Sequence, residues 1–246
     1  MKNAIIIGSH SDIAQQLTPL LQADGWNVEG WARGELQSMQ QFGFWDLCIV
    51  AVGRITPVGL WMDNDMFEWN ETMKSNLLLP IELLRRLWPK HNTGASVCWL
   101  AGSNPQMIMD GYSAYNVSKM AVLKAVEQLD HETPDAKFFA LGPGIVNTKI
   151  HRGTLKAAWP NPKLAAAIEA QKFTPIERVY GCLKWCVEQE KAVVGGRNIC
   201  ASDNWGETWT EPGISFDDQV MVATAERSLS WFLRDDPDLY RLRRVE

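Results

Sequence analysis

The chain has 246 residues, of which 46% are hydrophobic and 22% are charged, and its formal net charge is -5. This length and apolar content suit one α/β domain with a sizeable buried core. The charge argues against a nucleic-acid partner, because phosphate binding needs a basic surface and no lysine- or arginine-rich run is present.

Short apolar runs alternate along the chain with longer segments of helical period. In chain order, the pattern predicts a strand at 4–7, a helix at 13–21, strands at 26–31 and 46–52, and a helix at 77–87. There follow a strand at 96–101, a helix at 114–129, a strand at 137–141, a helix at 174–187 and a strand at 198–201. Thr174 and Pro175 are predicted as the N-cap and the first residue of the last helix.

The predicted strands are apolar along their length and do not alternate with polar residues. Strands that are covered by helices on both faces have this composition. We therefore predict an α/β fold with a Rossmann-like, doubly wound parallel sheet, in a single domain that spans residues 1–246.

Three stretches depart from this regular alternation. The stretch between Arg33 and Asp46 is too short for the helix and third strand expected there, so that strand is predicted to be shortened or missing. The polar segment 148–173 follows a strand end and has little core pattern, which is typical of a substrate loop. Residues 202–246 are predicted to form a C-terminal extension that packs on the domain or contacts another subunit.

The cysteines and the start of the chain indicate a reducing compartment. The five cysteines form no C-x-x-C pair, and Cys48 and Cys98 lie in predicted buried strands. Most of them are expected to be small buried side chains without a metal or a disulfide. The stretch before Gly8 is too short for a signal peptide and no apolar run would span a bilayer, so we expect a cytoplasmic protein.

The segment 8–14 (GSHSDIA) joins the first predicted strand to the first helix. Ligands of open α/β sheets bind at the carboxyl ends of strands, where the amides of a helix start can hold a pyrophosphate. Gly8 permits a tight turn, so we predict dinucleotide contacts at Gly8, Ser9, His10, Ser11, Asp12 and Ile13. Asp12 is a candidate N-cap, although its carboxylate lowers phosphate affinity. A plain strand–turn–helix junction has the same pattern.

Tyr115 and Lys119 are four residues apart and share one face of the helix predicted at 114–129. The pKa of a phenol is about 10, and a nearby ammonium lowers it, so the pair suits proton transfer. The same Y-x-x-x-K pattern recurs at Tyr180 and Lys184, so the spacing alone is not specific. We favour Tyr115, because Ser103 precedes it at a strand end and no serine or threonine precedes Tyr180 at that spacing.

These motifs together resemble those of the short-chain dehydrogenase/reductase family, in family order over residues 3–201. The segment 7–14 is similar to the T-G-x-x-x-G-I-G fingerprint, with Asp12 in place of the middle glycine. The segment 50–53 (VAVG) stands where the family has N-N-A-G, so only Gly53 matches. Further similarities lie at Asn76, at Ser103, one residue closer to the tyrosine than usual, and at 143–148 (PGIVNT).

The resemblance implies roles for these residues. Tyr115 is implied to exchange the proton with the substrate, Ser103 to bond the reacting oxygen, and Asn76 to link Lys119 to solvent. Lys119 is also implied to bond the nicotinamide ribose. Further cofactor contacts are implied at Gly53, Pro143, Gly144, Val146 and Thr148.

Ala32 occupies the position at which the family's NAD enzymes have an aspartate, and Arg33 follows it. An arginine there accommodates the 2′-phosphate of NADP, so we predict NADP in preference to NAD. A solvent-exposed surface arginine is the alternative.

The expected activity is hydride transfer between the nicotinamide and a carbonyl or alcohol carbon of a small-molecule substrate. A dinucleotide-binding regulator that has lost catalysis is one alternative, favoured by the altered glycine motif. A sugar-nucleotide epimerase is another, although it needs a larger C-terminal domain. Family members commonly form homodimers or homotetramers through the helices that carry Asn76 and Tyr115, and we expect the same here.

Seven of the twelve tryptophans fall into two groups. Four of them, Trp26, Trp31, Trp45 and Trp99, lie in or beside predicted core strands and are expected to be packing residues. Trp159, Trp205 and Trp209 lie in predicted loops on the nicotinamide side, where flat rings can stack on a sugar-like substrate.

Overall fold

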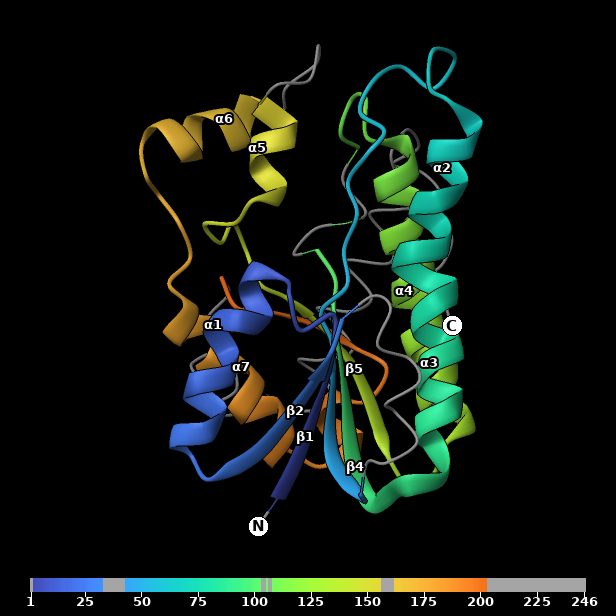
Figure 1. Ribbon diagram of the computed structural model, residues 1–246, viewed down its shortest axis with the longest axis vertical. Helices are drawn as coiled ribbons and strands as arrows, with labels where there is room; N and C mark the ends of the chain where they lie inside the picture. The colour runs from blue at the N-terminus through green and yellow to red at the C-terminus, as the bar shows by residue number, and fades with distance from the viewer. Residues whose placement is uncertain (1, 33–42, 103–104, 106–107, 156–161, 203–246) are drawn as a thin grey trace, which may run out of the picture. The chain divides into compact units, whose positions relative to one another are not determined.

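A six-stranded parallel sheet lies at the centre of the computed structural model (Figure 1). Its strands are β1 (Lys2–Ile7), β2 (Trp26–Trp31), β3 (Trp45–Val50), β4 (His91–Leu100), β5 (Lys137–Gly142) and β6 (Asn198–Cys200). Their order is β2-β1-β3-β4-β5-β6, and every neighbouring pair is parallel. The chain therefore winds outward from β1 in both directions, and the predicted fold class is confirmed.

The structure describes residues 2–32, 43–102, 105, 108–155 and 162–202. These residues belong to one compact unit, Met1–Asp203. Arg33, Ser103, Trp159 and the extension from residue 203 onward lie outside the described residues. Within the described ranges, the next strand after β2 is β3, which pairs on the far side of β1.

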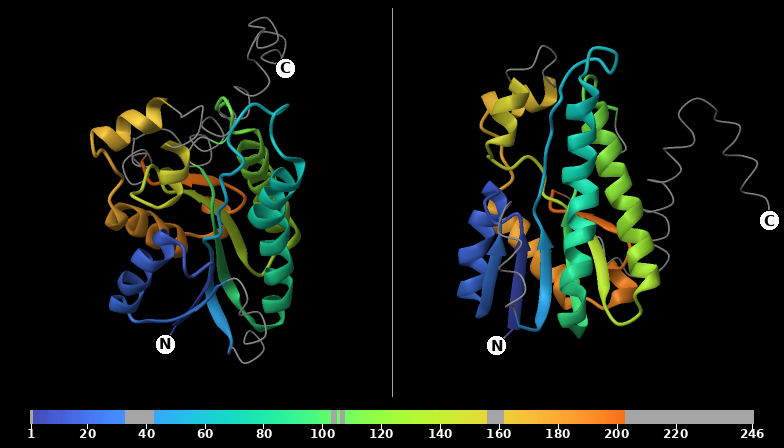
Figure 2. Two further views of the ribbon diagram at one scale, coloured as in Figure 1. Left: turned by 45° about the horizontal axis from the view of Figure 1, so that its top comes forward. Right: turned by 45° about the vertical axis from the view of Figure 1, so that its right-hand side comes forward.

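Helices cover both faces of the sheet (Figures 1 and 2). On one face, α1 (Asp12–Ala23) contacts α7 (Ile176–Glu188). On the other face, α2 (Met66–Met73) runs through a π-helical turn, η2 (Lys74–Leu78), into α3 (Leu79–Leu87), and this long helix packs on α4 (Ser113–Glu132). The remaining helical segments are η3 (Trp88–Lys90), α5 (Ile150–Leu155), α6 (Pro162–Glu169) and α8 (Lys191–Val194).

The core is built from the apolar strands and the inner faces of these helices. Trp45 and Trp99 are fully buried between the sheet and α3, together with aliphatic residues of β1, β3 and β4. The expectation that all strands are buried is wrong for β2, in which Asn27 and Glu29 are exposed and alternate with half-buried residues. A strand at the edge of the described sheet has neighbours on one side only, so fewer groups cover it.

Two local predictions differ from the structure. The segment 148–173 is not a plain loop, because it contains the short helices α5 and α6. The last long helix begins at Ile176, and its N-cap is Pro175. Thr174 does not cap that helix, because its side chain lies against Gly144 instead.

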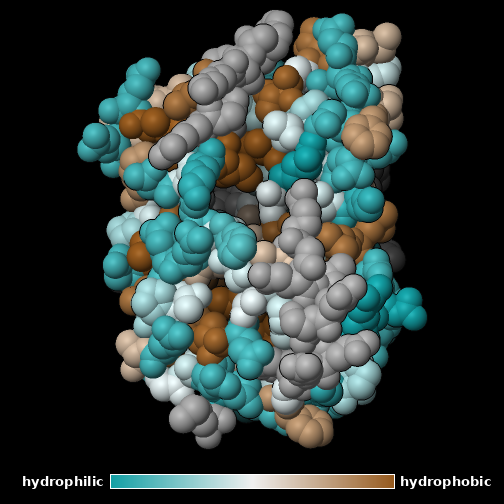
Figure 3. Space-filling view, in the orientation of Figure 1, coloured by the Kyte–Doolittle hydropathy of each residue, from teal (hydrophilic) through white to brown (hydrophobic). Residues whose placement is uncertain are grey.

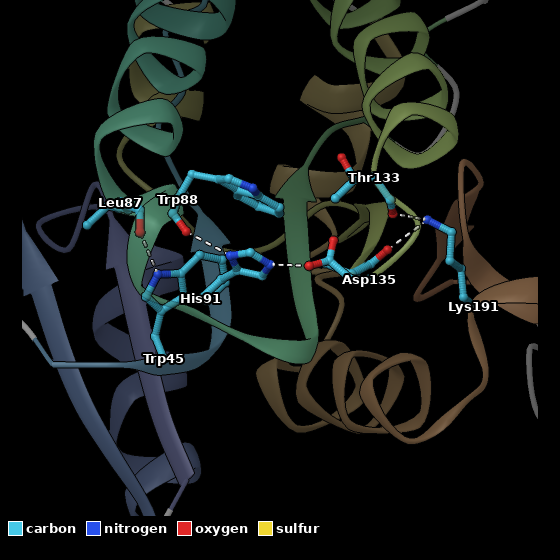
Figure 4. A network of polar contacts seen from close by, with 8 residues as sticks. Trp45, Leu87, Trp88, His91, Thr133, Asp135 and Lys191 are labelled. Atoms are coloured by element: carbon cyan, nitrogen blue, oxygen red, sulfur yellow. Dashed lines mark hydrogen bonds and ion pairs between the residues drawn. The ribbon is translucent and has the colours of Figure 1, made fainter.

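A polar and aromatic network fixes the amino-terminal end of β4 (Figure 4). The His91 ring stacks on Trp88 at a centroid distance of 4.1 Å, and its Nε2 lies 2.9 Å from Asp135 Oδ2. Trp45 Nε1 donates to the Leu87 carbonyl over 3.1 Å. These contacts connect β3, η3 and the turn before β5 at the end of the sheet opposite the strand carboxyl ends.

All five cysteines are buried, which agrees with the expectation for small apolar side chains. Among the described helices, none is both long enough and apolar enough to cross a membrane. No three His, Cys, Asp or Glu side chains gather into a metal-binding group within the part of the chain that the structure describes.

Candidate active site

The connections that follow β1, β3, β4 and β5 come together at the carboxyl end of the sheet, in the upper half of the molecule in Figure 1. Backbone hydrogen bonds join the strand ends, from Ala51 N to the Ile7 carbonyl over 2.8 Å and from Ala101 N to the Leu141 carbonyl over 3.0 Å. The surface view shows apolar side chains in this upper half, between polar patches (Figure 3). Parallel α/β proteins bind their ligands at this end of the sheet.

Gly8 forms the tight turn between β1 and α1. Its φ is +90°, and a Cβ at this position would come within 2.9 Å of Val52 Cγ2, so only glycine fits without displacement. Ser11 is the N-cap of α1, and its Oγ accepts a hydrogen bond from Ala14 N over 3.2 Å. The suggestion that Asp12 is the N-cap is therefore wrong, because Asp12 is the first residue of the helix.

Asp12 instead binds the segment that follows β5. Its carboxylate accepts a hydrogen bond from the backbone N of Lys149, over 2.5 Å to Oδ2, and Lys149 Nζ lies 3.1 Å from Oδ1. The two residues are 137 positions apart in the chain. The negative charge in the glycine turn thus has a partner, although the Lys149 side chain is 70% exposed.

Tyr115 and Lys119 lie in the first two turns of α4, and Lys119 Nζ is 5.9 Å from the centroid of the Tyr115 ring. Lys119 is only 4% exposed, and its Nζ donates to the Leu100 carbonyl at the end of β4 over 2.8 Å. The ammonium is therefore buried beside a neutral acceptor, which is a costly arrangement for a cation.

Burial controls the protonation of both groups. It raises the pKa of Tyr115 to about 12 and lowers the pKa of Lys119 to about 8. The side chain of Tyr115 is half-buried as a whole, so this loss of water concerns its hydroxyl group. The net shift of the Tyr115 pKa is therefore upward, because burial disfavours the charged phenolate.

Asn76 lies in the π-helical turn η2 and is fully buried. Its Oδ1 accepts from Arg54 N over 2.7 Å, and its Nδ2 donates to the Arg54 carbonyl over 2.9 Å and to Ser118 Oγ over 2.8 Å. Ser118 Oγ in turn donates to the Tyr115 carbonyl over 2.7 Å. Asn76 therefore joins the loop after β3 to the turn of α4 that carries Tyr115.

Both amide hydrogens of Asn76 are used in these bonds, so its direct partners are Arg54 and Ser118. Ser118 was not predicted from the sequence. Its only signal in the sequence was its position beside Lys119. A serine in a helix does not by itself indicate which residue it contacts.

The predicted nicotinamide segment follows β5. Gly144 has a φ of +75°, and a Cβ there would collide with the Thr174 hydroxyl group, so this position also requires glycine. Thr174 N donates to the Ile145 carbonyl over 2.8 Å, which holds the segment against the start of α7. Pro143 and Val146 are buried, and Thr148 is half-buried.

The other predicted contacts are placed as follows. Ser9 N donates to the Trp31 carbonyl over 3.2 Å, His10 is exposed and Ile13 is half-buried. A Cβ at Gly53 would meet only Ile150 Cδ1 at 3.8 Å, so no steric requirement fixes glycine there. Asn198 Nδ2 donates to the Gly102 carbonyl over 3.1 Å, immediately before Ser103.

The second tyrosine–lysine pair lies at the opposite end of the sheet. Tyr180 Oη and Lys184 Nζ both donate to Asp24 Oδ2, over 2.8 Å and 2.6 Å, and Asp24 is the C-cap of α1. The pKa of Lys184 is raised by this carboxylate. The pair borders a pocket of about 650 Å³ near Lys2 and Trp26. Tyr180 and Lys184 both bond Asp24 and so join α7 to the end of α1, which is a structural role.

Comparison with known proteins finds a matching family and a related sequence. Residues 12–202 match the model of a protein family described as enoyl-(acyl carrier protein) reductase. An uncharacterized oxidoreductase of Schizosaccharomyces pombe is 26% identical over 112 residues. That alignment covers 45% of this chain and 45% of the yeast protein, so it spans less than half of the relative.

Solved structures share the fold at low sequence identity. A short-chain dehydrogenase/reductase of Saccharomyces cerevisiae has a TM-score of 0.71 at 16% identity, over 83% of this chain and 97% of that one. Aldohexose dehydrogenase of Thermoplasma acidophilum has a TM-score of 0.69 at 16% identity, over 81% and 91% of the two chains. A small-chain dehydrogenase in complex with NADPH has a TM-score of 0.70 at 14% identity, over 89% and 99%.

Proposed function

Because the chain belongs to the short-chain dehydrogenase/reductase family, we propose that it transfers a hydride between NADP(H) and a carbonyl or alcohol carbon, with Tyr115 as the proton-transfer group. The observation that carries this proposal is the buried ammonium of Lys119, bonded to Leu100 at the carboxyl end of β4, beside the half-buried Tyr115. Lysine is almost never fully buried unless it is paired, and a strongly perturbed lysine beside a tyrosine in such a position favours a functional role.

The turn at Gly8 suits a dinucleotide, because it has no room for a Cβ and leads into the amino terminus of α1. The phosphate side would be held by Gly8, Ser9, His10, Ser11, Asp12 and Ile13. The nicotinamide side would be held by Gly53, Lys119, Pro143, Gly144, Val146 and Thr148. When bound, the nicotinamide supplies or accepts the hydride.

The protonation states favour carbonyl reduction. With a pKa of about 12, Tyr115 keeps its proton at neutral pH and can donate it to a substrate oxygen. With a pKa of about 8, Lys119 is mostly an ammonium at pH 7, so it can stabilise the phenolate that forms when the proton leaves. Ser103 is proposed to bond the same substrate oxygen.

Asn76 acts in this proposal mainly through its neighbours. Its bonds to Arg54 and Ser118 hold the turn of α4 that carries Tyr115 and Lys119 against the loop after β3. It is therefore a positioning residue, and its link to solvent through Lys119 remains a part of the proposal that rests on the family resemblance.

The choice of NADP rests on Arg33, and two of the similar solved structures are described as NADPH complexes. A titration of the purified protein that follows tryptophan fluorescence tests it. NADPH is expected to bind about tenfold more tightly than NADH, because an arginine adds charge-assisted hydrogen bonds to the 2′-phosphate. Arg33→Ala should remove most of that difference.

Other outcomes of the titration separate the alternatives. Equal binding of NADH would contradict the assignment to NADP. Failure of both dinucleotides to bind would contradict the enzyme proposal. Binding of NADPH without turnover of any carbonyl compound would favour a regulatory protein, an alternative supported by Asp12 in the glycine turn and by Val50-Ala51-Val52 in place of N-N-A.

We infer a small-molecule carbonyl or alcohol as the substrate, a homodimer or homotetramer as the assembly, and the cytoplasm as the location. The sugar-like alternative depends on Trp159, Trp205 and Trp209, which lie outside the described residues. Sedimentation of the purified protein distinguishes a monomer from either assembly.

A further inference from the structure

The contact between Asp12 and Lys149 joins the two segments that are proposed to hold the opposite halves of a dinucleotide. Asp12 is at the start of α1, directly after the glycine turn. Lys149 directly follows the segment 143–148 and precedes α5. The carboxylate binds the backbone N and the ammonium of the same residue, so it fixes both the main chain and the side chain at position 149.

The two side chains of this contact differ in their exposure to solvent. Its side chain is only 17% exposed, whereas that of Lys149 is 70% exposed. The hydrogen bond from the Lys149 amide is therefore the better protected of the two interactions, and the ion pair at the surface is weakened by solvent. Gly144 and Thr174 hold the other end of the same segment, so Asp12 completes its attachment.

We propose that Asp12 and Lys149 form a latch that positions the segment 143–149 beside the glycine turn and slows the release of a bound dinucleotide. This inference rests on the proposed function. It assigns a role to Asp12, which replaces the middle glycine of the fingerprint. The competing explanation is that Asp12 is only a carboxylate that repels the pyrophosphate, and the two explanations predict effects of opposite sign.

The test compares Asp12→Ala, Lys149→Met and the double variant with the wild-type protein. Stopped-flow tryptophan fluorescence measures the dissociation rate constant of NADPH. We expect a rise of about tenfold for Asp12→Ala, which loses both interactions, and of about twofold for Lys149→Met, which keeps the amide bond. The double variant should match Asp12→Ala, because the partners act as one unit.

Matched controls separate positioning from a general loss of structure. Lys124→Met and Glu127→Gln remove an exposed ion pair of 2.9 Å on α4 and should leave the dissociation rate unchanged. Lys149→Arg should keep the wild-type dissociation rate constant of NADPH. The association rate constant should change little in every variant. An unchanged rate in Asp12→Ala, or tighter binding of NADPH, would overturn the latch.

A second readout needs no dinucleotide. Hydrogen exchange of the protein by itself, followed in the peptide that contains residues 143–150, should be faster in Asp12→Ala than in the wild type, with the melting temperature nearly unchanged. Equal exchange in both proteins would show that the contact does not form, and would overturn the latch. If the wild type bound no dinucleotide, only the proposed function would fail, and the exchange result would still decide whether the contact exists.

Discussion

The two tyrosine–lysine pairs show how surroundings give different properties to the same residue types. Burial lowers the pKa of Lys119, whereas the carboxylate of Asp24 raises the pKa of Lys184. Tyr180 is likewise bonded to Asp24, so its hydroxyl hydrogen is already engaged. Only the pair at Tyr115 has a tyrosine near the strand carboxyl ends.

Replacement of each tyrosine by phenylalanine tests this difference. Tyr115→Phe should lower kcat about a thousandfold while NADPH still binds, because general acid catalysis contributes roughly 10² to 10⁴ in rate. Tyr180→Phe is the matched control and should leave kcat within about twofold of wild type, since its only assigned contact is structural. Retention of substantial turnover by Tyr115→Phe, measured with a carbonyl substrate, would contradict the assignment.

The buried ammonium of Lys119 also predicts a pH dependence. A lowered pKa of about 8 means that the cation is present below that pH and is lost above it. Because the cation stabilises the phenolate of Tyr115, kcat/KM for carbonyl reduction should be constant at neutral pH and fall by up to about tenfold per unit above pH 8. Tyr115 itself titrates near pH 12 and does not contribute in this range.

Lys119→Arg serves as the control for this profile, because a guanidinium stays charged throughout the range. The Lys119→Arg variant should be less active than the wild type, but its kcat/KM should not decline above pH 8. A wild-type profile that is flat from pH 7 to pH 10 would contradict the role of the lysine cation.

At the scale of elements, the π-helical turn η2 decides where Asn76 points. A π-helical turn inserts an extra residue into a helix and shifts the side chains that follow. Here it lies between α2 and α3 and contacts α4, and Asn76 in it reaches both Arg54 and Ser118. Such turns are frequent at functional sites, and no pattern in the sequence distinguishes them from a regular helix.

The end of α4 depends on Lys191, at the start of α8 (Figure 4). Its Nζ donates to Asp130 Oδ1 over 3.0 Å and to the carbonyls of Asp130, Thr133 and Ala136 over 2.6, 2.8 and 2.7 Å. Asp130 is 9% exposed and also accepts from Phe138 N over 2.8 Å. One cation thus holds the turn between α4 and β5.

Lys191→Met should lower the free energy of unfolding by about 2 kcal/mol, because a nearly buried carboxylate loses its charge partner. Urea unfolding, followed by circular dichroism, measures this change. Lys124→Met is again the control, since its ion pair is exposed and should contribute no more than about 1 kcal/mol. A loss no larger than that of the control would contradict the role of Lys191.

At the scale of the whole molecule, the sheet order follows from the alternation of strands and helices. Every described strand and the helices α1, α3, α4 and α7 were predictable, with ends displaced by a few residues, because apolar periodicity reports which side of a segment is buried. The helices α2 and α8 were not predicted. The other exceptions are local. The edge position of β2, the start of α7 and the helices α5 and α6 depend on neighbours that are distant in the chain.

The sequence by itself determined the parallel α/β fold, the family resemblance and the candidate residues of the site, because these depend on local pattern and on motif order. Only the tertiary structure decided which of the two lysines is buried at the strand ends, that Asn76 bonds Arg54 and Ser118, and that Asp12 binds Lys149. Each of these depends on residues that folding brings together, and the local sequence does not identify the distant partner. The Tyr115–Lys119 spacing was visible from the start, but the protonation of both groups was set by burial.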